Sequence, residues 1–300
     1  MRKDKDSDLA TSVRLAKGSA ILVDDAGLAP INARPQFKHY VVDIWKRRHF
    51  IWADSKGRQA TRHQDLLLGR IWDVINPLLN AGVYGVLFGV LLKTSHGIQN
   101  FIGYLVLGVV FFGFISHGLT AAGSVVRGSK SLITSFNFPI ASVVIAAGTR
   151  HFMESIVPGL VSIIFALGFQ IDKGLSWTII LVFPLYVLIH IFSTGVMLFV
   201  ARLTAFLPDL KSLLVVVNRA WFYCSGVFFE LSRFTSNEVL IYIFHLNPAF
   251  LFLSAIRDCV LYQTIPSIDV WGYLMVVSFL TFGFGLIFFW QAEDRYVGVK

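Results

Sequence analysis

Charged residues are scarce in this chain, and cysteine is almost absent. Asp, Glu, Lys and Arg make up 15% of its 300 residues, whereas soluble domains average about 25%. The two cysteines, Cys224 and Cys259, lie among apolar neighbours, so they supply neither a disulfide framework nor a metal-binding spacing. We expect both to be buried thiols that behave as small hydrophobic groups.

Nucleotide-binding and common catalytic motifs are also absent. Gly18, Gly57 and Gly174 each lie beside a lysine, but the rest of a G-x-x-x-x-G-K-[ST] phosphate loop is missing around them. The chain has no H-E-x-x-H, paired-cysteine or G-x-S-x-G pattern. We therefore expect no catalytic residue, metal or cofactor in this chain. A pump built from it would take its energy from a partner or from an ion gradient.

Long apolar segments, in contrast, follow one another along most of the chain. A run of about 18 apolar residues can cross a hydrocarbon core about 30 Å thick. The pattern predicts an all-α integral membrane protein, placed in the cytoplasmic (inner) membrane. We expect six transmembrane helices, at residues 75–92, 101–123, 140–169, 177–200, 212–229 and 270–290.

A further apolar segment lies between the last two predicted spans, at residues 239–262. It is broken by Asn247 and Pro248, and it carries Arg257 and Asp258 as a predicted buried pair. These features favour an outer re-entrant helical hairpin of two short helices over a seventh crossing, because irregular backbone is tolerated where protein or a water-filled cavity covers it.

The distribution of lysine and arginine orients the spans, because these residues concentrate on cytoplasmic loops. With six spans, both termini lie in the cytoplasm together with most of the basic residues. The basic residues left on the outer side are Lys93, Lys173, Arg233 and Arg257.

Three regions follow from the same pattern. Residues 1–35 are polar and poor in aromatics, which predicts a disordered cytoplasmic tail. Residues 36–73 combine apolar side chains at helical spacing with cations on other faces. They predict an interfacial amphipathic helix and a connector, although a helix packed on a partner would show the same pattern. Residues 74–300 form the transmembrane domain.

Two predicted spans contain ionisable residues. Arg150 and Glu154 stand four apart in the third span, so they share a helical face and are expected to form an intramembrane ion pair. Arg219, beside Asn218 in the fifth span, has no opposite charge nearby on its own helix. It either extends to lipid headgroups or binds an anionic substrate.

Ordered motifs resemble the type-2 ABC permeases for polysaccharide export. LGRIWDVINPLL at 68–79 and VYGVLFG at 83–89 resemble the start of the family's first span. FNFP at 136–139 precedes the third span, with Ile140 where the family often has arginine, and SGVFF at 225–229 resembles the end of the fifth. LNP at 246–248 and AIRD at 255–258 resemble its outer hairpin. The resemblance covers residues 37–300.

The resemblance implies the permease subunit of an exporter of lipid-linked polysaccharide, such as O-antigen, capsule, teichoic acid or cell-wall galactan. It also implies a homodimer in the lipid bilayer, bound to two cytoplasmic ATPase subunits that use Mg-ATP. The channel would be lined by the first and fifth spans, through Tyr84, Phe88, Arg219, Trp221, Phe222, Tyr223, Phe228 and Phe229. Coupling to the ATPase would fall in the loop 124–139, at Arg127, Lys130, Ser131, Phe136 and Pro139.

Three other functions fit parts of the sequence. An exporter of a drug or simple lipid could use the same scaffold. An integral membrane transferase would need clustered acids or histidines, whereas Glu154, His117, His151 and His190 are scattered. A secondary transporter is disfavoured because inverted repeats are not evident. Nothing in the chain predicts binding to nucleic acid.

Overall fold

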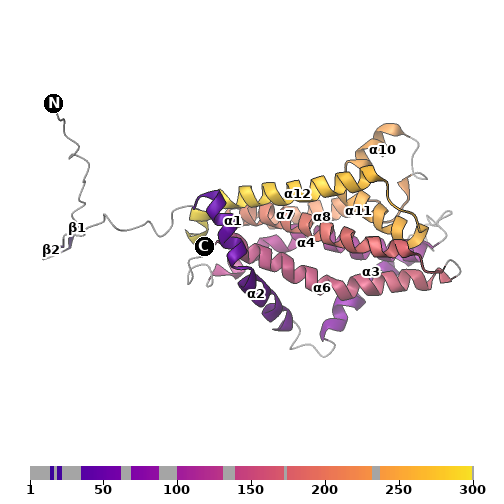
Figure 1. Ribbon diagram of the computed structural model, residues 1–300, viewed down its shortest axis with the longest axis horizontal. Helices are drawn as coiled ribbons and strands as arrows, with labels where there is room; N and C mark the ends of the chain where they lie inside the picture. The colour runs from indigo at the N-terminus through magenta and orange to yellow at the C-terminus, as the bar shows by residue number, and fades with distance from the viewer. Residues whose placement is uncertain are drawn as a thin grey trace.

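The computed structural model describes residues 14–16, 19–21, 35–61, 69–87, 100–130, 139–171, 174–231 and 237–298. From residue 35 onward the described chain is helical, and its long helices lie side by side (Figure 1). Two short strands, β1 (Arg14–Ala16) and β2 (Ser19–Ile21), pair antiparallel. They lie in the segment predicted to be disordered, most of which is outside the described residues.

Among the described residues, four helical segments are long and apolar enough to cross a membrane. They agree with the predicted second, third, fourth and sixth spans. They are α4 (Phe101–Gly128), α6 (Ala141–Gly168), α7 (Val182–Phe206) extended at its start by η4 (Trp177–Leu181), and α12 (Ile268–Trp290).

Shorter helices occupy the other two predicted spans. Helix α3 (Trp72–Tyr84) follows η1 (Gly69–Ile71), and the remainder of the predicted first span beyond residue 87 lies outside the described residues. Helix α8 (Leu210–Tyr223) ends earlier than the predicted 229. The chain turns there because Gly226 adopts a left-handed φ of 64°, a conformation open to glycine. Cys224, in this turn, is exposed rather than buried as expected, whereas Cys259 is buried.

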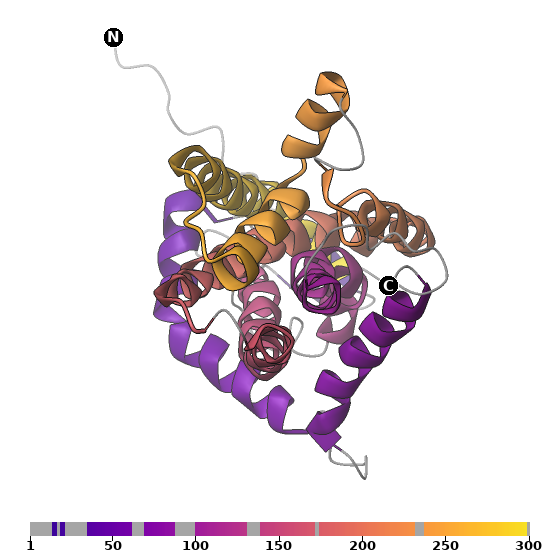
Figure 2. The same cartoon turned by 90° about the vertical axis from the view of Figure 1, so that its right-hand side faces the viewer.

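The predicted break at Asn247 separates α10 (Glu238–His245) from α11 (Pro248–Arg257), which continues into η5 (Asp258–Tyr262). The two halves are bent by 88°. Asn247 caps α11 by accepting a hydrogen bond from the Ala249 N–H at 3.0 Å, and Pro248 suits the first turn of the helix. Helix α10 projects from the bundle (Figures 1 and 2).

Helix α7 lies at the centre of the bundle, packed against α4, α6 and α12. Glycines allow this close approach, as in many membrane bundles. A Cβ atom on Gly118 of α4 would lie 1.9 Å from the Ser193 carbonyl oxygen of α7. A Cβ atom on Gly285 of α12 would lie 2.4 Å from the Gly195 carbonyl oxygen. Both positions therefore exclude any side chain.

The amphipathic segment forms α1 (Phe37–Lys46) and α2 (Arg48–Thr61). Tyr40 is buried in the bundle, whereas Trp45 is 70% exposed and Trp52 is also exposed. One apolar side of this segment thus packs on protein, and another faces outward. The sequence pattern did not separate the two sides.

Among the described residues, several arginines gather at one end of the bundle. Arg127, Arg202 and Arg295 lie at the end where α4, α7 and α12 finish and where the last described element, η6 (Glu293–Gly298), is found. We call this the basic end. The opposite end carries α10 and α11 and is called the hairpin end.

Candidate functional site

Aromatic side chains from α3, α4 and α8 converge toward the hairpin end. Tyr84 lies 5.6 Å from Phe222 and 5.0 Å from Phe228, measured between ring centroids. Phe222 and Phe228 are 5.1 Å apart. We call the following residues the aromatic cluster: Tyr84, Phe112, Trp221, Phe222, Tyr223 and Phe228. The structure thus brings together the predicted first- and fifth-span aromatics.

Phe112 belongs to the aromatic cluster, although the sequence did not predict it. Phe112 of α4 lies 5.5 Å from Trp221 and 5.0 Å from Phe222. Nothing local marks Phe112, because α4 contains several phenylalanines. Of the predicted channel residues, Phe229 instead contacts Phe244 of α10 at 5.7 Å, and Phe88 lies outside the described residues.

Some side chains of the aromatic cluster are buried, and others are accessible to a ligand. Phe228 is buried, and Trp221 donates its indole N–H to the Asn247 side-chain oxygen at 2.9 Å. Tyr223 is 47% exposed, and Arg219, one turn earlier on α8, is also exposed. The surface available to a ligand therefore combines a tyrosine ring with a guanidinium group, which suits an amphiphilic anion.

Asn247 joins the end of α8 to the hairpin. Its side-chain nitrogen donates to the Cys224 carbonyl and the Ser225 hydroxyl, both at 3.1 Å. Its side-chain oxygen accepts hydrogen bonds from the Trp221 indole N–H and from the Ala249 N–H at the start of α11. A single amide therefore positions the aromatic end of α8 against the start of α11.

Arg257 is buried in the hairpin, as predicted. Its guanidinium donates to the carbonyls of Tyr104, Gly226 and Val227, at 2.9–3.3 Å. It also lies 3.4 Å from the centroid of the Tyr104 ring. Asp258, the next residue, is half-buried. The bonds of Arg257 tie the turn after α8 to α4.

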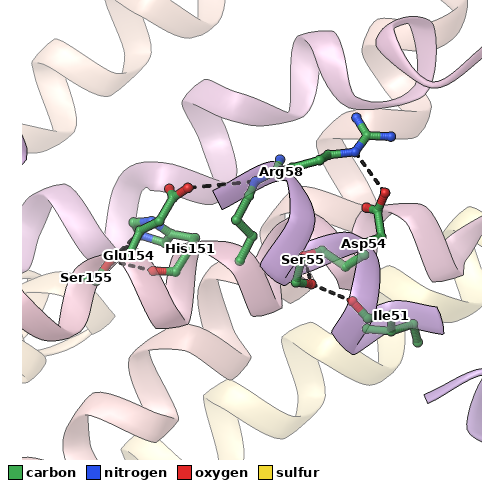
Figure 3. Close-up of polar contacts among 9 residues, drawn as sticks. Ile51, Asp54, Ser55, Arg58, His151, Glu154 and Ser155 are labelled. Carbon is green, nitrogen blue, oxygen red and sulfur yellow. Dashed lines mark hydrogen bonds and ion pairs between the residues drawn. The ribbon is translucent and has the colours of Figure 1, made fainter. Parts of the chain in front are cut away.

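The predicted pair of Arg150 and Glu154 is present on α6, with the arginine Nε 4.0 Å from a carboxylate oxygen. Helix α2 lies beside it (Figure 3), and Arg58 there contacts Asp54 at 2.9 Å. The Ser55 hydroxyl donates to the Ala146 carbonyl of α6 at 2.8 Å. The ion pair thus belongs to the junction of α2 and α6.

Three histidines that are scattered in the sequence meet in the structure. His117 and His151 stack with ring centroids 3.5 Å apart, and His190 lies 5.1 Å from His151. His190 is buried against Tyr186 and Phe152, at 4.2 and 5.1 Å. Within the described residues, no three His, Cys, Asp or Glu side chains are placed to hold a metal ion. The histidines pack on one another and on the aromatic rings of Phe114, Phe152 and Tyr186.

The predicted coupling residues that the structure describes lie at the basic end. Arg127 is in the last turn of α4, and Lys130 follows it, both exposed. Helix α4 extends through Gly128, further into the predicted loop than expected. Pro139 is buried just before α6, whereas Ser131 and Phe136 lie outside the described residues.

These helices define an integral membrane protein, and known proteins narrow the class. The chain matches the ABC-2 type transporter family over residues 51–261, which is more than half of its length. The chain belongs to this family and is a transporter permease. The matched range includes the aromatic cluster, the hairpin and Arg257. Membership implies an ABC ATPase as a partner.

Two relatives carry a more specific name. The chain is 23% identical to the O-antigen export system permease protein RfbA of Myxococcus xanthus over 242 residues, covering 79% of this chain and 90% of the relative. It is 25% identical to the protein of the same name from Klebsiella pneumoniae over 175 residues, covering 56% and 64% respectively.

Proposed function

We propose that this chain is the permease subunit of an ABC exporter that moves lipid-linked polysaccharide across the cytoplasmic membrane. ATP is hydrolysed in separate subunits. The observation that carries the proposal is the aromatic cluster beside exposed Arg219, in a chain of the ABC-2 family. Aromatic faces accommodate sugar rings, and arginine binds phosphate through two parallel hydrogen bonds. The O-antigen export named for both relatives supports the same substrate class.

The assembly that we propose is a homodimer bound to two ATPase subunits. Helices α3 and α8 expose apolar side chains such as Val83, at 58%, and Val216, at 64%. An apolar groove of about 740 Å³ between α3 and α6 adds to this uncovered surface. A second copy and lipid would cover these faces, and the channel would lie along α3 and α8. The loop 124–139, with Arg127, Lys130, Ser131, Phe136 and Pro139, would contact the ATPase.

The topology that we propose has six crossings, with α3 and α8 as parts of the first and fifth. Residues 238–262 form a re-entrant hairpin, which the 88° bend supports. Both termini are cytoplasmic, because the basic end holds Arg127, Arg202 and Arg295. Helices α1 and α2 lie at the cytoplasmic membrane surface, where exposed Trp45 would meet lipid.

Single cysteines test this topology in a background in which Cys224 and Cys259 are replaced by serine. Cysteine at Ser267, an exposed residue before α12, is expected to react with impermeant maleimide added to intact cells. Cysteine at Asp209 or Arg295, both exposed, should react only after permeabilisation. Labelling of the Arg295 position in intact cells would instead establish a seventh crossing.

Arg219 is placed to receive a lipid-linked phosphate. It lies nine residues after the start of α8, or about 14 Å along the axis at 1.5 Å per residue. A pyrophosphate-linked lipid that enters from the basic end would meet this guanidinium before its sugars reach Tyr223. Lysine would supply the charge without the planar pair of donors.

Replacing Arg219 with alanine should therefore weaken the substrate's apparent affinity roughly ten- to hundred-fold, with a smaller loss in Arg219→Lys. The measurement is ATP hydrolysis by the reconstituted complex, titrated with lipid-linked polysaccharide. Lys211→Ala, which removes an exposed cation from the start of the same helix, is the matched control. An unchanged half-maximal concentration in Arg219→Ala would show that the arginine serves only lipid headgroups.

Depletion of this chain in cells tests the proposed function itself. Lipid-linked polymer should accumulate in the cytoplasmic leaflet, where it is protected from an impermeant oxidant added to spheroplasts. Restoring the chain should expose the polymer to the oxidant. If the polymer is equally accessible with and without the chain, this chain does not export it.

A further inference from the structure

Helix α6 begins without a capping side chain from its own neighbourhood. Its first residue is Ala141, and Ile140 at the preceding position provides no side-chain hydrogen bond. The first N–H groups of a helix have no partner within the helix. Glu293 accepts the Ile140 N–H at 2.6 Å, and the Tyr40 hydroxyl accepts the Ala141 N–H at 3.1 Å. These capping groups come from 153 and 101 positions away.

Tyr40 and Glu293 also bind each other. The Tyr40 hydroxyl donates to the second carboxylate oxygen of Glu293 at 2.6 Å. Tyr40 is 0% exposed and Glu293 is 9% exposed. Burial raises the pKa of Glu293 from 4.5 to about 7, although the bonds from Tyr40 and Ile140 act in the opposite direction. A carboxylate at a helix N-terminus is favoured electrostatically. We call these two side chains and their bonds to α6 the Tyr40–Glu293 latch.

Aromatic contacts extend the latch to the ends of α7 and α12. Tyr296 stacks on Phe289 at 4.4 Å and on Phe206 at 5.6 Å. Trp290 contacts the Phe37 ring at 5.3 Å and donates its indole N–H to the Pro35 carbonyl at 2.9 Å. The start of α1, the start of α6 and the C-terminal turn η6 therefore form one connected unit. Pro139, the last residue of the loop proposed to meet the ATPase, lies next to it.

We propose that Tyr40 and Glu293 are positioning residues that join α1, the start of α6 and η6 into the unit through which movement of the loop 124–139 reaches the membrane helices. This inference rests on the proposed function. Without the latch, the end of the loop moves independently of α1 and η6. ATP hydrolysis then continues while less polymer is moved for each ATP.

The test uses the permease–ATPase complex in proteoliposomes, with lipid-linked polysaccharide as substrate. Glu293→Ala should lower the polymer moved per ATP about tenfold, because it removes the acceptor of the bonds from Tyr40 and Ile140. Hydrogen exchange of the peptide covering residues 139–145 should become faster at the same time. Tyr40→Phe should act in the same direction, and its effect should not add to that of Glu293→Gln. Asp294→Asn, an exposed neighbour with the same charge change, is the control.

A pH series distinguishes positioning from simple packing. The pKa of Glu293 is raised from 4.5 to about 7. The stability that Glu293 contributes to the latch is therefore complete below about pH 4.5 and is lost as pH rises through about 7. Amide exchange is base-catalysed, so each rate is first divided by the intrinsic rate at that pH. The resulting protection of residues 139–145 should fall between about pH 6 and 8 in wild type and stay constant in Glu293→Gln. The groups that face the carboxyl are Tyr40 on α1 and Asp294 and Tyr296 on η6, with Arg202 of α7 beside Tyr296.

The outcomes separate the latch from the proposed function. If wild type moves no polymer, the proposed function is wrong, and the inference of coupling falls with it, whatever the exchange shows. If wild type moves polymer and all latch variants match it in polymer per ATP and in exchange, the inference is wrong while the function stands. Should Glu293→Ala fail to assemble, Glu293→Gln and Tyr40→Phe give the same comparison.

Discussion

Gly118→Ala is expected to push α4 away from α7 and to destabilise the folded protein. The added Cβ would meet the Ser193 carbonyl oxygen at 1.9 Å and the Met197 nitrogen at 3.1 Å. Both are backbone atoms of the central helix, so no side-chain rotation relieves the clash. We expect a loss of about 3 kcal/mol, which would lower the melting temperature by roughly 5–10 °C.

The measurement is the thermal stability of detergent-purified protein, followed by size-exclusion chromatography. Gly113→Ala on the same helix is the matched control, because a Cβ there meets nothing within 4 Å. Helix α12 offers the same contrast between Gly285, which lies against Gly195, and Gly283, which has open space. Equal stability of the Gly118 and Gly113 variants would contradict the observed packing of α4 on α7.

Arg257→Met is expected to destabilise the hairpin end by about 3–5 kcal/mol. The side chain is 3% exposed, and its removal takes a donor from the carbonyls of Tyr104, Gly226 and Val227, of which Gly226 keeps the Tyr104 hydroxyl as a donor. Arg257→Lys should rescue only in part, because one ammonium group cannot reproduce the planar set of donors.

Limited proteolysis and thermal melting of the purified protein measure this loss, with new cleavage expected near residues 224–231. Arg295→Ala, an exposed arginine at the basic end, controls for the loss of charge. A variant at Arg257 as stable as the one at Arg295 would show that the buried bonds contribute little.

The long helices were predictable because their determinants are local. Hydropathy placed the third span at 140–169, and the structure has α6 at Ala141–Gly168. The start of α11 was equally accessible, since Asn247 and Pro248 form a helix cap within a few residues. The predicted resemblance to type-2 ABC permeases is confirmed by the family match over residues 51–261.

Features that depend on distant residues could not be read from local patterns. The end of α8 is set by Gly226, Asn247 and Arg257, which act together only in the folded chain. The capping of α6 by Glu293 spans 153 positions, and no motif signals it. The stack of His117 on His151 likewise requires the register of α4 against α6.

The candidate site was predictable in composition and less so in arrangement. Aromatic density near Arg219 indicated Phe222, Tyr223 and Phe228, and Tyr84 does meet two of them. In the structure, however, Phe228 is buried and cannot contact a ligand. Phe112, on a helix that was not predicted to line the channel, also belongs to the aromatic cluster.

Reconstituted transport tests the central claim most directly. Proteoliposomes would contain this chain, its ABC ATPase and lipid-linked polysaccharide in the leaflet that faces the ATPase. We predict that ATP moves the polymer to the opposite leaflet, where an added glycosidase cleaves it. Omitting the ATPase or replacing ATP with a non-hydrolysable analogue should abolish cleavage. Sustained ATP hydrolysis with no cleavage, or cleavage that does not depend on ATP, would contradict the assignment.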